Sequence, residues 1–368
     1  MASRTGVRAR IVARALAARA FGGPRSAPQD PRRVLVAHQL LLGDTIMLTP
    51  LLAKLRARYP AADIAMALPP AFAPLYSSRP YGVRALPFSL RDPATYAALR
   101  KEDRFDLTVI PGDNRFSWLA QALGARWIVA FSGDRPAYKN WLVDAAHPYP
   151  EPPAAWGDMT AGLVSGPAPA PFHPGAWPDP DAAGFTLPEK PYCVLHVGAS
   201  SPRKLWPATS WSALASILSE RGLRPVWSAG RGEEHLIAAA DPRSRFLSCA
   251  GQLDLARMWH LVKGAALLVA PDTGIAHLGK ATLTPTLALY GEGPAWLYGR
   301  GDFWRDCPFH QIVLSDLPPR SQKTLFHRHL AALSDAARAP ANPGLVRGIG
   351  LDTVAGAVRD LVGTPVAR

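Results

Sequence analysis

An apolar run in the second half of the chain ends in residues that can bind an anion. The stretch LLVAPDTGIAHLGKA places Asp272 and Thr273 directly after a predicted strand, and Gly274 opens the next helix. An aspartate at the end of a buried strand needs a partner, because burying an unpaired charge is costly. Asp272 or Thr273 is a good N-cap, and the positive end of such a helix attracts a phosphate, which Gly274 allows to approach closely.

Two further side chains, His277 and Asp44, have roles that depend on geometry. His277 lies in the second turn of the same predicted helix, where its ring N–H can reach a phosphate oxygen, although a single helical histidine is commonly structural. Asp44 follows Gly43 near the end of the first predicted strand. It is either the N-cap of a helix over Thr45–Arg58 or a carboxylate that faces the anion site and takes a proton from a hydroxyl nucleophile.

Two more loops carry groups suited to a nucleotide. After the strand in YCVLHVGAS, Ser200 and Ser201 supply hydroxyls and Lys204 follows. Backbone N–H groups, hydroxyls and a cation gathered in one loop can hold a diphosphate. At GRGEE, the carboxylates of Glu233 and Glu234 begin a helix. They can accept ribose hydroxyls, or they simply interact with the helix dipole.

The hydrophobic pattern predicts the elements that bring these loops together. From Arg33 the chain reads RVLVAHQLLLGDTIMLTPLLAKLRARYP, a β-branched strand followed by apolar residues at helical spacing, and this alternation resumes after Pro191. It predicts α/β domains with parallel sheets covered on both faces. Prolines crowd between Pro148 and Pro191, which indicates a linker with one helix near 156–165. Two doubly wound, Rossmann-like domains in tandem leave a central cleft beyond the carboxyl ends of their strands.

We divide the chain into five segments on this basis. The last of them holds a helix in LDTVAGAVRDLVG, for which we consider packing back on the N-terminal domain. The segments are a basic N-terminal extension at 1–30, an N-terminal Rossmann-like domain at 31–165, a proline-rich linker at 166–190, a C-terminal Rossmann-like domain at 191–340, and a C-terminal tail at 341–368.

The composition indicates a globular chain with affinity for anions. The sequence has 368 residues, is 48% hydrophobic and carries a formal net charge of +13. Nucleic acid, acidic lipid headgroups and a phosphorylated substrate satisfy this charge equally. The three cysteines have no disulfide or metal-ligand spacing and fit a reducing cytoplasm. No apolar run approaches the roughly 20 residues that a transmembrane helix needs.

The first 25 residues contain six arginines and no acid. Arg10 and Arg14, like Ile11 and Ala15, fall at helical spacing, which is typical of a basic amphipathic helix resting on anionic lipid. A frayed basic extension and an organellar transit peptide have similar compositions. All three interpretations stay open.

Several motifs of other enzyme classes are missing. The chain has no GxxxxGK[ST] phosphate loop, no GxGxxG opening a helix after the first strand, no GxSxG elbow and no HExxH. Nucleoside triphosphatases, dinucleotide oxidoreductases, α/β hydrolases and zinc proteases are therefore disfavoured, and we expect no metal ligands.

Three blocks together resemble bacterial glycosyltransferase family 9, which contains the lipopolysaccharide heptosyltransferases. They run in order from Val34 to Gly291, which makes the resemblance more specific than any one block. The blocks are VLVAHQLLLGDTIMLTPLLAKLRARYP with its Gly-Asp loop, VLHVGASSPRKLWPATSWSALASIL, and LLVAPDTGIAHLGKATLTPTLALYG with an Asp-[Ser/Thr]-Gly-x-x-His motif. The first block departs from the family in having His38–Leu42 where Arg and Ser often precede Gly-Asp.

This resemblance implies a GT-B fold, a nucleotide-sugar donor that is usually ADP-heptose, and inversion at the anomeric carbon without a metal or other cofactor. By position, Asp44, beside Gly43, matches the general base and Lys204 the lysine that offsets charge on the donor diphosphate. Glu234 or Glu233 matches the acid associated with the nucleoside. The remaining matches are Ser200 and Ser201 beside the diphosphate, and Asp272, Thr273, Gly274 and His277 at the donor phosphate and sugar.

We therefore predict a glycosyltransferase that moves a sugar, with heptose the expected one, to a lipopolysaccharide core or related lipid-linked saccharide. Its basic surface would meet acidic lipid at the cytoplasmic face of the membrane. A non-catalytic nucleotide-sugar or anionic-glycan binding protein of the same fold is the alternative. A nucleic-acid binder is suggested by charge alone, and we do not expect nucleic acid as a partner.

Overall fold

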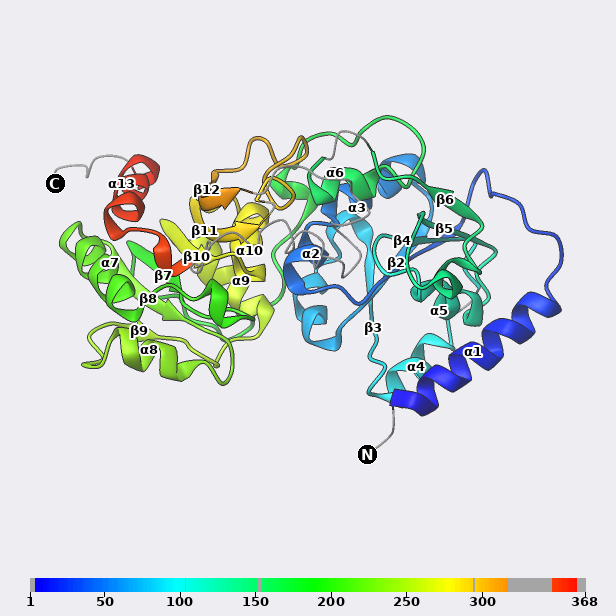
Figure 1. Ribbon diagram of the computed structural model, residues 1–368, viewed down its shortest axis with the longest axis horizontal. Helices are drawn as coiled ribbons and strands as arrows, with labels where there is room; N and C mark the ends of the chain where they lie inside the picture. The colour runs from blue at the N-terminus through cyan, green and yellow to red at the C-terminus, as the bar shows by residue number, and fades with distance from the viewer. Residues whose placement is uncertain (1–3, 103, 151–153, 294, 317–345, 363–368) are drawn as a thin grey trace.

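Two parallel sheets of six strands each, flanked by helices, organise the part of the chain that the structure describes (Figure 1). The structure is a computed structural model that describes residues 4–102, 104–150, 154–293, 295–316 and 346–362. The first sheet has the order β3-β2-β1-β4-β5-β6 and the second β12-β11-β10-β7-β8-β9. The predicted α/β class with two doubly wound sheets is confirmed.

The first sheet and its helices are built from residues 4–161. The strands are β1 (Arg33–Ala37), β2 (Asp63–Leu68), β3 (Arg84–Pro87), β4 (Leu107–Ile110), β5 (Trp127–Phe131) and β6 (Ala145–His147). The helices are α1 (Arg4–Ala20), α2 (Leu42–Ile46), α3 (Thr49–Arg58), α4 (Pro93–Leu99), α5 (Phe116–Ala122) and α6 (Trp156–Ala161), with 3₁₀ turns that include η1 (Pro70–Tyr76) and η3 (Ala137–Asn140).

The second sheet begins after the proline-rich segment. Its strands are β7 (Tyr192–His196), β8 (Arg224–Ser228), β9 (Leu247–Ser248), β10 (Leu267–Pro271), β11 (Thr286–Gly293) and β12 (Phe309–Asp316). The helices are α7 (Ala208–Glu220), α8 (Glu234–Ala240), α9 (Leu255–Gly264), α10 (Gly274–Thr282) and α13 (Leu351–Val362), and η5 (Pro202–Lys204) is a 3₁₀ turn. The limits of the five predicted segments stay predictions, and residues 317–345 and 363–368 of the last two lie outside the described residues.

Each sheet has one point at which the strand order reverses. In the first sheet β2 and β3 extend from one side of β1, and β4, β5 and β6 from the other. In the second sheet β7 holds the same position between β8 and β10. Ligands of doubly wound proteins bind beyond the carboxyl ends of the strands at such a point. The topology therefore predicts one binding site in each domain.

Alternation along β1 explains why helices cover both faces of the first sheet. Val34 and Val36 are buried in the cluster that contains the leucines of α3. Leu35 and Ala37 belong to a different cluster, which contains Ile11 of α1 and residues of α5. Successive side chains of a strand point to opposite faces, so a continuous apolar run is buried on both sides.

An aromatic stack joins the two domains through the proline-rich segment. The ring centroids of Tyr76 and Trp177 lie 5.2 Å apart, as do those of Trp177 and Trp259. Trp259 Nε1 donates to Asp179 Oδ1 at 2.8 Å, and Lys263 forms an ion pair with the same carboxylate at 2.6 Å. The segment is thus fastened to α9 rather than spanning the domains as a free tether.

The expected helix over 45–58 is divided into α2 and α3. Pro50 has no N–H to donate to the carbonyl of Ile46, which would be its partner in a continuous α-helix. The Thr49 hydroxyl donates to that carbonyl instead, at 2.5 Å. The chain therefore turns between the two short helices.

The basic N-terminal segment forms helix α1, which packs on the first domain. Val7, Ile11 and Ala15 are buried in the cluster shared with α5. Arg14 Nε donates to the carbonyl of Ala122 at 2.7 Å. Arg25, which follows α1, donates a hydrogen bond from Nε to Asp144 Oδ1 at 2.7 Å. The frayed-extension interpretation is wrong for residues 4–20, and this apolar stripe is covered by protein rather than open to lipid.

The last helix also differs from its expected position. Val354 and Val358 of α13 are buried in a cluster with Trp211 and Leu214 of α7. The helix therefore covers the C-terminal sheet, at the end of the molecule remote from the N-terminal domain (Figure 1). Helical spacing identified the apolar stripe but carried no information about which domain it would cover.

Candidate functional site

A cavity of about 600 Å³ lies between the two domains. The N-terminal domain contributes the loop after β1, and the C-terminal domain contributes the loops after β7, β8 and β10. The second sheet therefore presents its point of strand reversal to this cavity. The predicted site residues that line the cavity are Gly43, Asp44, Ser200, Lys204, Glu233, Asp272, Thr273, Gly274 and His277.

Asp44 lies in the first turn of α2 and is half-buried. The N-cap position of this helix is Leu41, so the interpretation of Asp44 as a simple N-cap is wrong. Burial raises the pKa of the Asp44 carboxyl to about 6; the charge of Asp272 acts in the same direction, while Lys204 and a backbone hydrogen bond from Leu41 oppose it. A carboxyl with this pKa can exchange a proton near neutral pH.

Lys204 and Asp272 form an ion pair across the C-terminal side of the cavity. Lys204 Nζ lies 2.6 Å from Asp272 Oδ2 and 3.0 Å from the backbone carbonyl of the same residue. The two side chains are 38% and 20% exposed, so the pair remains open to a ligand. Asp272 thereby positions the ammonium group next to the start of α10.

Glu233 and Glu234 have different surroundings, although they are neighbours in sequence. Glu233 lines the cavity and accepts hydrogen bonds from the backbone N–H groups of Ala199 at 3.1 Å and Gly230 at 2.7 Å. Its carboxylate therefore connects the loops after β7 and β8. Glu234 is exposed, accepts from Gly232 N at 3.1 Å, and is not among the residues that line the cavity.

The two serines also separate. Ser200 is exposed and lines the cavity. Ser201 is not among the lining residues; it occupies the N-cap position of η5, where its hydroxyl accepts from Arg203 N at 3.3 Å. Of the predicted hydroxyl pair, the structure therefore brings only Ser200 to the cavity wall.

Two buried polar atoms beside the cavity have no hydrogen-bond partner among the described residues: Thr273 Oγ1 and His277 Nδ1. Thr273 occupies the N-cap position of α10, but its side chain makes no capping hydrogen bond. Burial, together with the charges of Lys280 and Lys204, lowers the pKa of His277 well below its usual value, so the imidazole is neutral. Buried polar atoms without partners are rare, and here they leave a hydroxyl and an imidazole for a ligand.

Two glycines in the motifs allow the domains to pack closely. A Cβ on Gly43 would lie 2.7 Å from His277 Cδ2, and a Cβ on Gly274 would lie 2.7 Å from Leu42 Cβ. Gly274 also lines the cavity, and its expected role in letting a phosphate approach closely stays a prediction. Both glycines are thus required where α2 of one domain meets α10 of the other.

Among the described residues that line the cavity, the charged side chains give no excess of positive charge. Three are acids, Asp44, Glu233 and Asp272, and two are cations, Lys204 and Arg231. Lys204 is held by an acid, and Glu233 is already satisfied by backbone N–H groups. The attraction for an anion therefore depends on placed donors, namely the start of α10, the two cations and the unsatisfied hydroxyl.

Several lining residues carried no signal in the sequence. His196 and Ser228 end strands β7 and β8, and His196 Nδ1 lies 2.9 Å from Ser228 Oγ. Met258 of α9 and Tyr298 complete this part of the wall. In the sequence these residues resemble ordinary core positions. Only His196 and Ser228 could have been found, by their position at strand ends beside loops already selected.

Two features of the described residues bear on the class of site. Among the described residues, no group of three or more His, Cys, Asp or Glu side chains has a geometry that could hold a metal ion. Among the described helices, none combines the length and the apolar character that crossing a bilayer requires.

Comparison with known proteins agrees with the geometry. A model of glycosyltransferase family 9 (heptosyltransferase) matches residues 98–295, more than half of the chain. Lipopolysaccharide heptosyltransferase 1 of Pseudomonas aeruginosa is 28% identical over 296 residues, which cover 73% of this chain and 82% of the relative.

Solved structures share the arrangement of the two domains. The Escherichia coli ADP-heptose lipopolysaccharide heptosyltransferase II has a TM-score of 0.67 and 19% identity, covering 90% of this chain and 98% of its own. The iron-containing dodecameric glycosyltransferase TibC of enterotoxigenic Escherichia coli has a TM-score of 0.55 and 14% identity, covering 91% and 77%. At these identities the likeness concerns the fold, and the expected GT-B fold with two Rossmann-like domains is confirmed.

Proposed function

Because this chain belongs to glycosyltransferase family 9 and is a glycosyltransferase, we propose that it transfers heptose from ADP-heptose to a lipopolysaccharide core or a related lipid-linked saccharide. The donor and acceptor follow from the names of its relatives, a lipopolysaccharide heptosyltransferase and an ADP-heptose enzyme. The observation that carries the proposal is the interdomain cavity that Asp44 lines from one domain and the Lys204–Asp272 pair from the other.

The donor would bind to the C-terminal side of this cavity. Its diphosphate would meet Lys204, the start of α10 and the Thr273 hydroxyl, and the neutral His277 can donate an N–H to a phosphate or sugar oxygen. Glu233, rather than Glu234, would face the nucleoside, because Glu233 lines the cavity. Ser200 would supply the one hydroxyl that remains from the predicted serine pair.

The reaction would then proceed by inversion in one displacement. The acceptor hydroxyl gives its proton to the Asp44 carboxylate, and its oxygen forms a bond to the anomeric carbon. The bond from that carbon to the phosphate oxygen breaks on the opposite face, and the nucleoside diphosphate leaves with the electron pair. Lys204 and the start of α10 offset the charge that develops on the diphosphate.

We propose that this displacement needs neither a metal nor another cofactor. The support is Lys204, whose ammonium group can supply the cation that stabilises the leaving diphosphate and whose partner Asp272 is already paired with it. The iron-containing structural neighbour makes a direct test necessary. Transfer is therefore to be assayed with and without EDTA, and dependence on added iron or magnesium would contradict this part of the proposal.

We place the enzyme at the inner face of the cytoplasmic membrane, in peripheral contact with acidic lipid. The support is the net charge of +13 and the apolar side chain of Phe21, which directly follows α1 and is 91% exposed. Exposed cations together with an exposed apolar side chain favour a surface that carries anionic headgroups.

The experiment that tests the function offers the purified protein a panel of nucleotide sugars and lipid A–core acceptors truncated at different lengths. Mass spectrometry of the acceptors reports the sugar transferred and the acceptor length required. We expect the mass increment of one heptose with ADP-heptose. An increment of another sugar would correct the donor, and no increment with any pair would favour a binding protein over an enzyme.

The pKa of Asp44 predicts how the activity depends on pH. Asp44 must be ionised to accept a proton, and its pKa is raised to about 6. We therefore expect kcat/KM for the donor to be constant above pH 7 and to fall about tenfold per pH unit below about pH 6, because kcat/KM reports the free enzyme. Initial rates at low donor concentration between pH 5 and 8 measure this limb; an acid limb near pH 4 would place Asp44 in water instead.

A further inference from the structure

A second, larger cavity of about 980 Å³ lies within the N-terminal domain. Its walls include residues from the segments that follow β1, β2, β3 and β4, so it lies beyond the carboxyl ends of these strands. This is the point of strand reversal in the first sheet, as the interdomain cavity is in the second. By the rule for doubly wound sheets, a ligand is expected here too. The proposed donor site does not include this N-terminal cavity.

The lining of this cavity is chiefly hydrocarbon. Ile11 and Val12 come from α1, Leu90 follows β3, and Phe116 and Leu119 come from α5. Apolar side chains of this number fit an alkyl chain better than a saccharide, whose hydroxyls would lack partners. The ligand that this part of the cavity selects is therefore a hydrocarbon chain.

The lining also contains three cations, Arg8, Arg91 and Arg115. Arg8 of α1 and Arg91 after β3 are both exposed, and neither forms an ion pair with a described acid. Arg115, the third cation, is paired with Asp113, the one acid among the described residues that line the cavity. The two uncommitted guanidinium groups are complementary to an acidic headgroup next to the chain.

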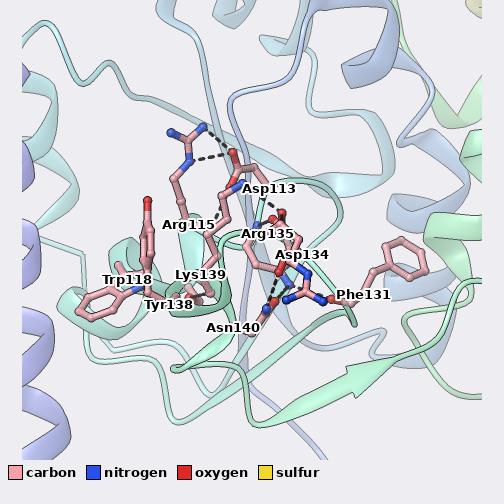
Figure 2. Close-up of polar contacts among 11 residues, drawn as sticks. Asp113, Arg115, Trp118, Phe131, Asp134, Arg135, Tyr138, Lys139 and Asn140 are labelled. Carbon is pink, nitrogen blue, oxygen red and sulfur yellow. Dashed lines mark hydrogen bonds and ion pairs between the residues drawn. The ribbon is translucent and has the colours of Figure 1, made fainter. Parts of the chain in front are cut away.

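The aromatic wall of the cavity is held by a buried polar network (Figure 2). Tyr138 and Trp141 lie on and after η3 and line the cavity, where Trp141 is 68% exposed. Asp134 is 5% exposed and accepts from Lys139 Nζ at 3.0 Å and from the backbone N–H of Asn114 at 2.9 Å. This network fixes η3 against the start of α5, so the aromatic side chains that line the cavity are held in place.

One loop connects this cavity with the catalytic cleft. Gln39 and Leu40 line the N-terminal cavity, and the residues that follow them, up to Asp44, line the interdomain cavity. Gln39 Nε2 donates to the carbonyl of Phe88 at 2.8 Å, which fastens the loop to the segment after β3. A molecule that occupies the N-terminal cavity therefore contacts the loop that leads to the proposed base.

We propose that the N-terminal cavity binds an acyl chain of the acceptor lipid, with Arg8 and Arg91 binding the acidic group near the chain. This inference rests on the proposed function, since it assigns a second part of the acceptor to a site outside the cleft. Val12, Tyr138 and Trp141 line the cavity and are 41%, 41% and 68% exposed, so the chain enters from an apolar surface. Helix α1 thus forms part of the acceptor site.

The first test compares Val12→Asp with the matched control Leu16→Asp. Both residues are exposed on α1, but only Val12 lines the cavity. Wild type should have a KM at least about tenfold lower for the acylated acceptor than for the fully deacylated saccharide, since each buried methylene contributes. Val12→Asp should raise the KM for the acylated acceptor about tenfold and leave the deacylated KM within about twofold; Leu16→Asp should change neither.

The second test needs no transfer activity. Dodecyl phosphate, below its micellar concentration, is titrated into the protein, and tryptophan fluorescence reports binding through Trp118 and Trp141 in the cavity wall. We expect saturable binding that weakens about tenfold or more in Arg8→Glu/Arg91→Glu but not in Arg10→Glu/Arg100→Glu, the same charge change at exposed residues that do not line the cavity. Dodecyltrimethylammonium should bind more weakly than dodecyl phosphate.

The two tests separate this inference from the proposed function. If dodecyl phosphate binds as described and no lipid-linked saccharide is glycosylated, the cavity stands and the proposed function fails. If transfer occurs but wild type has equal KM values for acylated and deacylated acceptors, the acyl-chain proposal is overturned. Absence of saturable dodecyl phosphate binding, or equal effects of Val12→Asp and Leu16→Asp, would overturn it as well.

Discussion

Asp44→Asn is expected to lower kcat by about 10²- to 10⁴-fold, the range that general-base catalysis contributes, while the donor still binds. The carboxyl lies in the first turn of α2 and its pKa is raised to about 6, so it is ionised at neutral pH yet basic enough to accept a proton. Asparagine keeps the size of the side chain but cannot take the proton. Steady-state transfer at pH 7.5 and calorimetric titration with the donor measure the two quantities.

The control for this prediction is Asp352→Asn, which makes the same change at an exposed residue in the first turn of α13. Its kcat should equal that of wild type. Equal activity of Asp44→Asn and wild type would remove the base assignment. Loss of donor binding together with turnover would instead indicate that Asp44 holds the cleft together.

Lys204→Ala is expected to lower kcat by about 10²-fold or more, by analogy with the loss of one preorganised donor that stabilises developing charge. The ammonium group is held 2.6 Å from Asp272 Oδ2 before any ligand arrives, so it needs little reorganisation. Its removal leaves Asp272 without this partner in the same cavity as Asp44. The negative charge that develops on the leaving diphosphate would then lose one stabilising cation, while Asp44 and Asp272 remain in the cavity.

Arg203→Ala is the matched control, because Arg203 is the adjacent residue, is exposed and does not line the cavity. It should keep turnover within about twofold of wild type, as expected for a surface cation. Lys204→Arg should retain more activity than Lys204→Ala, since it keeps the charge but not the geometry. An effect of Lys204→Ala on donor KM alone would show that the lysine binds the ground state and does not stabilise the transition state.

The sequence predicted the fold class and much of the cleft, for a physical reason. Strand ends in a parallel sheet lie at one edge, so a run such as LLVAPDTG places Asp272 and its neighbours there without knowledge of distant contacts. The separate loops that carry Lys204 and Glu233 follow the same rule. The predictions of the fold class and of these loops therefore depended on the regular spacing of apolar residues in strands and helices.

The wrong or undecided predictions depended on contacts between distant segments. The apolar stripe of α1 was visible in the sequence, but that α5 rather than lipid covers it was not. The apolar stripe of α13 was also visible, but its packing on the C-terminal domain rather than the N-terminal one was not. Glu233 and Glu234 are adjacent glutamates that the sequence does not distinguish. The backbone N–H groups of Ala199 and Gly230 bind the carboxylate of Glu233, which is the one that faces the cavity.

The N-terminal cavity was not predicted because its lining comes from short, separate segments. Ile11, Leu90 and Phe116 each resemble ordinary core residues in their own segments. Only the sheet brings them to one edge. The point of strand reversal is known once the strand order is known, and the strand order is not encoded by local periodicity.

The measurement that tests the central claim most directly is the acid limb of kcat/KM for the donor in wild type, Asp272→Asn and Lys204→Ala. The charge of Asp272 raises the pKa of Asp44 and that of Lys204 lowers it. If the two domains bring these residues into one cleft, the limb lies near pH 6 in wild type, moves to lower pH in Asp272→Asn and moves to higher pH in Lys204→Ala. A limb that stays at the same pH in all three enzymes would contradict the shared cleft and the mechanism built on it.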